Sequence, residues 1–182
     1  MAFVTARELE AGLDRIRRSP KEEGRLALIV RRPAVDQREV LEVGRLSEVD
    51  GLEGDTWRAR GSSRTPDGSA HPDMQVNLIN ARAIALISPD EGRRALAGDQ
   101  LHVDLDLSGE NLPPGTRLSV GEAVIEVTAE PHRGCKKFSA RFGVDALRFV
   151  NSSIGRELNL RGINARVVQG GTIRRGDAVR KL

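Results

Sequence analysis

Alternation of apolar and polar positions is the clearest pattern in the chain, and it predicts a protein of short strands. Residues 101–107 read Leu-His-Val-Asp-Leu-Asp-Leu, a period of two that indicates a strand with one buried face. Residues 118–129 show two strand patterns around a tight turn, as in a hairpin. The remaining predicted strands are 25–30, 40–46, 74–79, 164–169 and 178–182.

Helices are predicted where capping residues precede apolar stripes. Thr5 and Glu8 form a capping box, and the apolar stripe that follows predicts a helix from about 5 to 18, packed outside the strands. A second helix is predicted over 81–87, capped by Asn80, and a third is predicted to begin at the capping box Ser88-Pro89-Asp90-Glu91. A fourth is predicted over 141–149.

The order of these elements predicts the fold class. Strands do not alternate regularly with helices, which argues against a doubly wound sheet and favours a mainly β, α+β protein. We therefore expect a mixed, closed or nearly closed β-barrel with peripheral helices. The length suits a single domain over 1–182, with 1–24 as an N-terminal helical extension. Residues 51–73 lack apolar periodicity and are predicted to form a long loop, of a kind that is usually functional or disordered.

Charge and aromatic content limit the partners that we expect. The chain has 29 Lys and Arg against 26 Asp and Glu, a net charge of +3, and the charges are interspersed rather than gathered in a block. Four Phe, one Trp and no Tyr leave few rings on which bases could stack. We therefore expect a small anionic ligand in a local basic pocket rather than a nucleic acid.

The sequence also carries a prediction about the cellular compartment. One cysteine cannot form an intrachain disulfide, so folding does not depend on an oxidising compartment. The first residues do not follow the pattern of a secretory leader, and no apolar run approaches the roughly 20 residues of a membrane span. We expect a cytoplasmic protein without membrane association.

The segment 131–137, Pro-His-Arg-Gly-Cys-Lys-Lys, surrounds the only cysteine, Cys135, with polar side chains. A thiol acts as a nucleophile or metal ligand in its thiolate form, which nearby cations favour. Four Lys and Arg side chains lie within six residues of Cys135, and we expect an exposed, reactive thiol in a cleft. Two alternatives are a buried cysteine that acts as a small hydrophobe and a zinc site shared with His132, for which only His71 and His102 remain as nitrogen donors.

Two loops offer other polar side chains to a ligand. In 108–115, Asn111 has an amide that both donates and accepts hydrogen bonds, which suits the edge of a heterocycle. In 51–73, Arg58, Arg60 and Arg64 carry guanidinium forks that match phosphate oxygens. A solvated turn and a flexible loop explain the same residues without any ligand.

Taken in order, these segments resemble the MOSC domain family, named for the C-terminal region of molybdenum-cofactor sulfurase, and within it the small single-domain bacterial members. The resemblance covers about 43–182. Its four landmarks are Gly54-Asp55 with His71-Pro72-Asp73, Gly109-Glu110-Asn111-Leu112, Pro131 to Cys135 with Phe138, and the stretch from Arg161 to Asp177. The sequence departs from the family pattern where His132-Arg133-Gly134 separates Pro131 from Cys135.

The resemblance implies a mixed β-barrel flanked by helices and a site for the molybdenum cofactor, a pterin dithiolene that carries a phosphate. It makes Cys135 the catalytic cysteine and the ligand to molybdenum. It further implies an oxidoreductase that reduces N-hydroxylated compounds such as amidoximes, with electrons from an external donor. The other cofactor contacts expected from it, converging with Cys135 on one cavity, are Asn111, His71, Asp73, Arg58, Arg60, Arg64, Arg133 and Lys136.

Two other functions stay open at this stage. Some members of the family were proposed to carry sulfur for metal–sulfur cluster chemistry. Cys135 would then accept a persulfide from a pyridoxal-phosphate desulfurase, which requires an exposed thiol and no metal. The third possibility is a binding or regulatory domain whose cysteine is structural.

Overall fold

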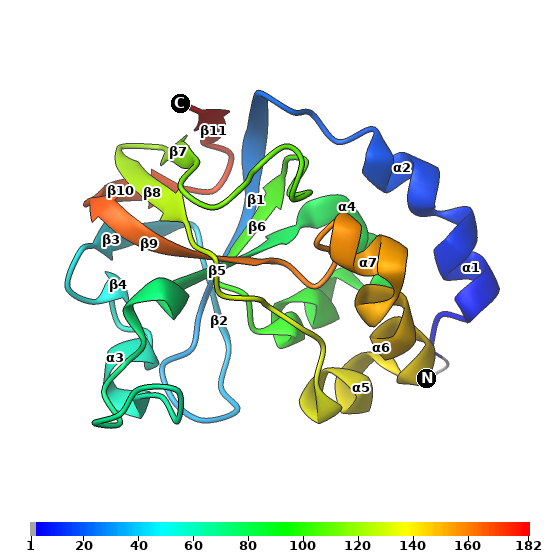
Figure 1. The fold of residues 1–182 in the computed structure, drawn as a ribbon, viewed down its shortest axis with the longest axis horizontal. Helices are drawn as coiled ribbons and strands as arrows, with labels where there is room; N and C mark the ends of the chain where they lie inside the picture. The colour runs from blue at the N-terminus through cyan, green and yellow to red at the C-terminus, as the bar shows by residue number, and fades with distance from the viewer. Residues whose placement is uncertain (1–2) are drawn as a thin grey trace.

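Seven strands close into a barrel in the computed structural model, which describes residues 3–182 (Figure 1). They are β1 Glu23–Arg31, β5 Val76–Asn80, β6 Leu101–Asp104, β7 Arg117–Val120, β8 Ala123–Val127, β9 Ile163–Gln169 and β11 Ala178–Lys181. Their order is β11-β7-β8-β9-β5-β6-β1, and β1 pairs with β11 to complete the ring. The β5–β6 pair is parallel and the other pairs are antiparallel, so the barrel is mixed. The predicted fold class is confirmed.

Two additions extend the barrel. The short strand β2, Glu39–Leu41, pairs with the end of β1. A separate sheet in the order β10-β3-β4 consists of Gly171–Arg174, Val43–Ser47 and Gly51–Leu52. Leu46, Leu52 and Ile173 of this sheet are buried in the same apolar cluster as the inward side chains of the barrel. The small sheet therefore covers part of the barrel core.

Most helices lie together on one side of the barrel (Figure 1). The helices are α1 Ala6–Ala11, α2 Leu13–Arg17, α3 Trp57–Arg60, α4 Ala81–Ile87, α5 Lys136–Phe142, α6 Val144–Asn151 and α7 Ser153–Glu157, with 3-10 turns at Pro72–Met74 and Glu91–Ala97. A second apolar cluster joins α1, α4 and α5 to the outer side of β5 through Leu9, Ile84, Phe142 and Ile79. This layer supports α5, the helix that follows the cysteine.

The predicted capping residues account for two helix starts. Thr5 and Glu8 form the capping box of α1, as predicted, and Asn80 caps α4 by accepting hydrogen bonds from the two backbone N–H groups of Arg82 and Ala83. The predicted helix over 5–18 is present but divided at Gly12. A Cβ at Gly12 would lie 2.4 Å from a methyl carbon of Leu86, so a larger residue here would have to displace that side chain of α4.

Other local predictions were wrong. The predicted capping box at Ser88 does not form, because Asp90 caps the turn that begins at Glu91. The predicted strand over 40–46 is divided between β2 and β3. The predicted loop over 51–73 contains β4 and α3, and its Trp57 is buried.

The predicted helix over 141–149 is present but divided at Gly143, and its first part belongs to a helix that starts earlier than predicted. Gly143 has a φ of 92°, a conformation that favours glycine, and it separates α5 from α6. The helix α5 begins at Lys136, directly after Cys135, and the cysteine is its N-cap residue. Within residues 3–182 no helix is long and apolar enough to cross a membrane.

Candidate functional site

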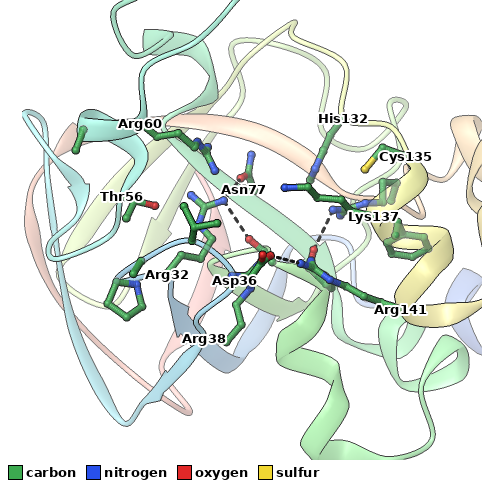
Figure 2. Close-up of a pocket in the computed structure, with 18 residues that line it drawn as sticks. Arg32, Asp36, Arg38, Thr56, Arg60, Asn77, His132, Cys135, Lys137 and Arg141 are labelled. Carbon is green, nitrogen blue, oxygen red and sulfur yellow. Dashed lines mark hydrogen bonds and ion pairs between the residues drawn. The ribbon is translucent and has the colours of Figure 1, made fainter. Parts of the chain in front are cut away.

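A cavity of about 580 Å³ lies where β1 ends and α5 begins (Figure 2). Its walls come from the loop after β1, the α3 region, β5, the loop before β6, the cysteine loop and α5. A volume of this size is typical of sites for small molecules and cofactors. The polar lining consists of Arg32, Asp36, Arg38, Thr56, Arg60, Asn77, His132, Cys135, Lys137, Arg141 and Arg161.

Cys135 lies in the wall of this cavity with an exposed thiol. The residue before it is fixed by a reciprocal pair of hydrogen bonds: Gly134 N donates to Asn151 Oδ1 at 3.1 Å, and Asn151 Nδ2 donates to Gly134 O at 3.1 Å. A Cβ at Gly134 would lie 2.8 Å from Leu147 and 2.9 Å from Val150, so the loop packs tightly on α6. The expectation of an exposed thiol in a cleft is confirmed, and the buried alternative does not hold.

One wall is built on a buried ion pair between Arg32 and Asp55. The Asp55 side chain is 0% exposed and accepts hydrogen bonds from Arg32 Nε at 2.8 Å and Arg32 Nη2 at 2.7 Å. It also accepts from the backbone N–H groups of Arg32 and Trp57. A buried carboxylate requires such partners, so the Gly54-Asp55 landmark has a structural role behind the cavity.

The opposite wall contains a second buried carboxylate, Asp99. Arg161 donates to both of its oxygens, at 2.9 and 2.7 Å, and stacks its guanidinium over the Phe138 ring at 4.9 Å. Burial raises the pKa of Asp99, and Arg161 opposes that change. His132 Nδ1 lies 3.3 Å from Asp99 Oδ1 but makes no hydrogen bond within residues 3–182. Burial, followed by repulsion from Arg161, lowers the pKa of His132 well below its usual value, so His132 is neutral at neutral pH.

Three cations of the lining have no ion-pair partner among the described residues: Arg38, Arg60 and Lys137. Desolvation and then repulsion from Arg141 and Arg32 lower the pKa of Arg38, whose Nε is buried without a hydrogen-bond partner. Desolvation and the charge of Arg32 likewise lower the pKa of Arg60. The cavity therefore has an excess of positive charge, which a bound anion would neutralise.

The structure brings only part of the predicted set to the cavity. Cys135 and Arg60 line it. Three predicted cations lie elsewhere: Arg133 lines a smaller separate hollow, Lys136 is exposed outside the cavity lining, and Arg58 pairs with Asp50. The remaining loop residues form a surface network in which Arg64 and His71 lie near Glu130, and Asp73 lies 3.8 Å from Arg166.

Asn111 corrects the expectation of a single converging site. Its amide donates to the backbone oxygens of Lys21 at 3.0 Å and Asp106 at 2.8 Å, and its oxygen accepts from Lys181 Nζ at 3.3 Å. Lys21 precedes β1, whereas the cavity begins at Arg32, just after β1 ends. Asn111 and Cys135 are thus separated by the length of β1, and the amide of Asn111 holds a loop to the barrel.

Sequence reasoning missed most of the polar lining. Arg38 and Asn77 were not considered, and Arg161 was noted only as part of a strand pattern. Arg32 and Arg161 are held in the site by carboxylates that lie 23 and 62 residues away in the sequence, so no local pattern indicates these ion pairs. Arg32 directly follows β1 and Arg161 lies two residues before β9, and a cation at the end of a strand is the one local signal that could have identified them.

The comparisons with known proteins agree with this architecture. A family model described as MOSC domain matches residues 65–180. Among solved structures, the YUAD protein from Bacillus subtilis is similar at a TM-score of 0.64 and 13% identity, covering 86% of this chain and 94% of that one. YiiM from Escherichia coli is similar at a TM-score of 0.55 and 19% identity, covering 87% of this chain and 69% of that one. YiiM from Geobacillus stearothermophilus is similar at a TM-score of 0.57 and 14% identity, covering 87% of this chain and 75% of that one. A search of curated proteins gave no significant match.

Proposed function

The chain belongs to the MOSC domain family, and we propose that its cavity binds the molybdenum cofactor with Cys135 as the protein ligand to the metal. The observation that carries the proposal is an exposed thiol in the wall of a cavity whose cations Arg38, Arg60 and Lys137 lack carboxylate partners among residues 3–182. A soft thiolate suits molybdenum, and unpaired cations suit a phosphate-bearing pterin.

The donor groups around Cys135 fit a metal that arrives with its own ligands. Among residues 3–182, no three His, Cys, Asp or Glu side chains gather where they could hold a metal ion. A metal bound at Cys135 would therefore need further donors from outside the chain. The two sulfurs of a pterin dithiolene are donors of that kind.

The side of the cavity away from Cys135 supports a phosphate site. Arg60 and Arg38 flank the buried Arg32, and the Thr56 hydroxyl lies on the same side (Figure 2). Guanidinium groups bind phosphate oxygens bidentately. A dianion there would offset the desolvation, and then the repulsion, that lower the pKa values of Arg38 and Arg60. We therefore assign the phosphate to Arg38 and Arg60, in place of the predicted Arg58, Arg64, Arg133 and Lys136.

When bound, the cofactor would supply two-electron chemistry at molybdenum. The reaction that we propose is reduction of an N-hydroxylated compound, in which the N–O bond breaks, two electrons and two protons are consumed, and the oxygen leaves as water. The electrons would come from an external protein or small-molecule donor. His132 lines the wall with a side chain that is 16% exposed, and it is neutral at neutral pH. Its Nδ1 is buried beside Asp99, which would leave Nε2 to orient the substrate.

Metal analysis tests the cofactor assignment. Protein produced in a host that makes the cofactor should retain molybdenum through gel filtration, and Cys135→Ala should lose at least nine-tenths of it. Asn111→Ala is the matched control, because its side chain lies at the far end of β1 and should leave the molybdenum content of folded protein unchanged. Molybdenum content that is equal in wild type and Cys135→Ala would refute the ligand assignment, and a wild type free of molybdenum would refute the cofactor itself.

A sulfur carrier is the second candidate, and it is favoured by the exposure of the only thiol in the chain. The Cys135 thiolate would attack the outer sulfur of a desulfurase persulfide, the S–S bond of the donor would break, and the desulfurase thiolate would leave. Incubation with a pyridoxal-phosphate desulfurase and cysteine should then add about 32 Da, one sulfur atom, to the intact mass. Cys135→Ser should show no addition, and an unmodified wild type would eliminate this candidate.

A further inference from the structure

Two cations of α5 share the part of the cavity that contains Cys135. Lys137 and Arg141 are four residues apart on the helix, so their side chains lie on one face, and both line the cavity beside Cys135 (Figure 2). Lys137 has no hydrogen-bond or ion-pair partner within residues 3–182. This pair belongs to α5, whereas Arg38 and Arg60, to which the cofactor phosphate is assigned, belong to the loop after β1 and to α3.

The protein places one of its own carboxylates on one member of this pair, Arg141. Asp36 is the only Asp or Glu in the described lining of the cavity, and its Oδ1 lies 3.2 Å from Arg141 Nη2. The residue belongs to the loop between β1 and β2, and its side chain is 70% exposed. Its φ of 58° lies in the left-handed region, which aspartate adopts more readily than most residues. An ion pair at so exposed a position is weak, so a competing carboxylate would displace Asp36 readily.

The Arg141 side chain is held in place by contacts that do not involve Asp36. Its Nη1 donates to Leu96 O at 2.9 Å, and its backbone oxygen accepts from Arg93 Nη2 at 2.7 Å. Neither contact involves Asp36, so the guanidinium keeps its place when the loop moves. The charge of Arg141 also contributes to the lowered pKa of Arg38, which indicates that Asp36 neutralises this region only in part.

We propose that the cavity selects a small substrate that carries a carboxylate next to its reacting atom. This carboxylate would replace Asp36 on Arg141 and would also pair with Lys137, which Asp36 leaves free. The inference deepens the proposed function, because it names the class of compound that reaches Cys135 and its metal. It does not depend on the metal, since the charges belong to the chain itself.

Alkylation of Cys135 in metal-free protein tests the proposal. Iodoacetate and iodoacetamide attack the same thiolate, so the ratio of their rate constants cancels the thiolate fraction and reports on attraction of the carboxylate alone. Lys137→Met and Arg141→Met should each lower this ratio about three- to tenfold, as expected for loss of one charge within several ångströms of the reagent. Asp36→Asn should raise the ratio.

Lys136→Met is the matched control, because it removes the same charge from the adjacent residue of α5, which is exposed outside the cavity lining. Its ratio should stay within twofold of wild type at physiological ionic strength. Acetate should slow the iodoacetate reaction of wild type more than chloride at equal ionic strength, and this protection should disappear in Lys137→Met. The exposed Lys137 makes that variant the safe test if Arg141→Met fails to fold.

An unchanged ratio in Lys137→Met, or an equal fall in Lys136→Met, would overturn the proposal. The alkylation ratio and the metal analysis can fail independently of one another. Protein that binds molybdenum but shows no selective ratio would keep the proposed function and lose the carboxylate site. Protein without molybdenum that shows the ratio would keep the carboxylate site and lose the cofactor.

Discussion

Removal of the Asp55 carboxylate should destabilise the protein strongly, because it leaves the buried Arg32 guanidinium without its counterion. The Asp55 side chain is 0% exposed and that of Arg32 is 8% exposed. Asp55→Ala would also remove acceptors from the backbone N–H groups of Arg32 and Trp57. Breaking one partner of a buried pair costs about 3–5 kcal/mol. Arg32 Nη1 keeps weak contacts with Asn77 and Gly98, at 3.3 and 3.2 Å, so we expect about 3–4 kcal/mol.

A double-mutant cycle isolates the charge from the lost backbone contacts. In an Arg32→Met background no cation is left unpaired, so Asp55→Ala should cost only about 1–2 kcal/mol, for its two backbone hydrogen bonds. Urea unfolding can be followed by circular dichroism and by the fluorescence of Trp57, the only tryptophan. A coupling free energy below about 0.5 kcal/mol would refute the reasoning, since the two residues would then act independently.

Three further predictions test other parts of the structure. Burial lowers the pKa of His102 to about 3 from 6.5, so near pH 5 only the unfolded state binds this proton. The free energy of unfolding of the wild type, measured by urea titration, should therefore fall by about 2 kcal/mol from pH 7 to pH 5, and His102→Gln should not show this fall. Gly162→Ala should lower the midpoint of thermal unfolding, because φ is 108° and a Cβ would lie 2.2 Å from Leu78 O. Asn111→Ala should cost about 1–3 kcal/mol in urea unfolding while leaving the alkylation rate of Cys135 unchanged.

Local patterns predicted the elements whose structure is determined locally. The hairpin of β7 and β8 follows from alternation and a tight turn, and the cap of α4 follows from one asparagine. The pairing of β3 with β10 could not be predicted in this way, because it joins residues more than 120 positions apart. Its strands have a weak alternation of their own and are stabilised by their place on the barrel core.

The site residues, like the strands and helices, could be predicted only where the local sequence determines them. Cys135 was identified because one short segment combines the only thiol with several cations, although only Lys137 and Arg141 of these cations line the cavity. Arg161 and Asp99 are brought together by packing between β9 and the loop before β6, and no local pattern indicates that contact. Asn111 shows the opposite error: a polar residue in a loop suggested a ligand, whereas the fold uses its amide for backbone oxygens that would otherwise be unsatisfied.

The position of Cys135 depends on Asn151, which makes this asparagine a positioning residue for whatever chemistry the thiol performs. Its amide satisfies both the N–H and the C=O of Gly134, the residue directly before the cysteine. Asn151→Ala would leave these two backbone groups without a protein partner, at a cost of about 1–3 kcal/mol, and would free the loop from α6. We expect faster hydrogen exchange confined to 132–135 and an altered rate of Cys135 alkylation by iodoacetamide.

A control is needed because a general loss of stability could produce the same exchange. Asn159 also donates its amide to a backbone oxygen, Leu107 O at 2.8 Å, and it lines the same hollow as Arg133 without a side-chain hydrogen bond to the cysteine loop. Asn159→Gly suits its φ of 48° and should lower stability without changing exchange at 132–135. If both variants accelerate hydrogen exchange at 132–135 equally, Asn151 does not fix the position of Cys135 more than general stability does. If Asn151→Ala alone does so, the geometry of the thiol is set from α6 rather than by the residues that surround it in sequence.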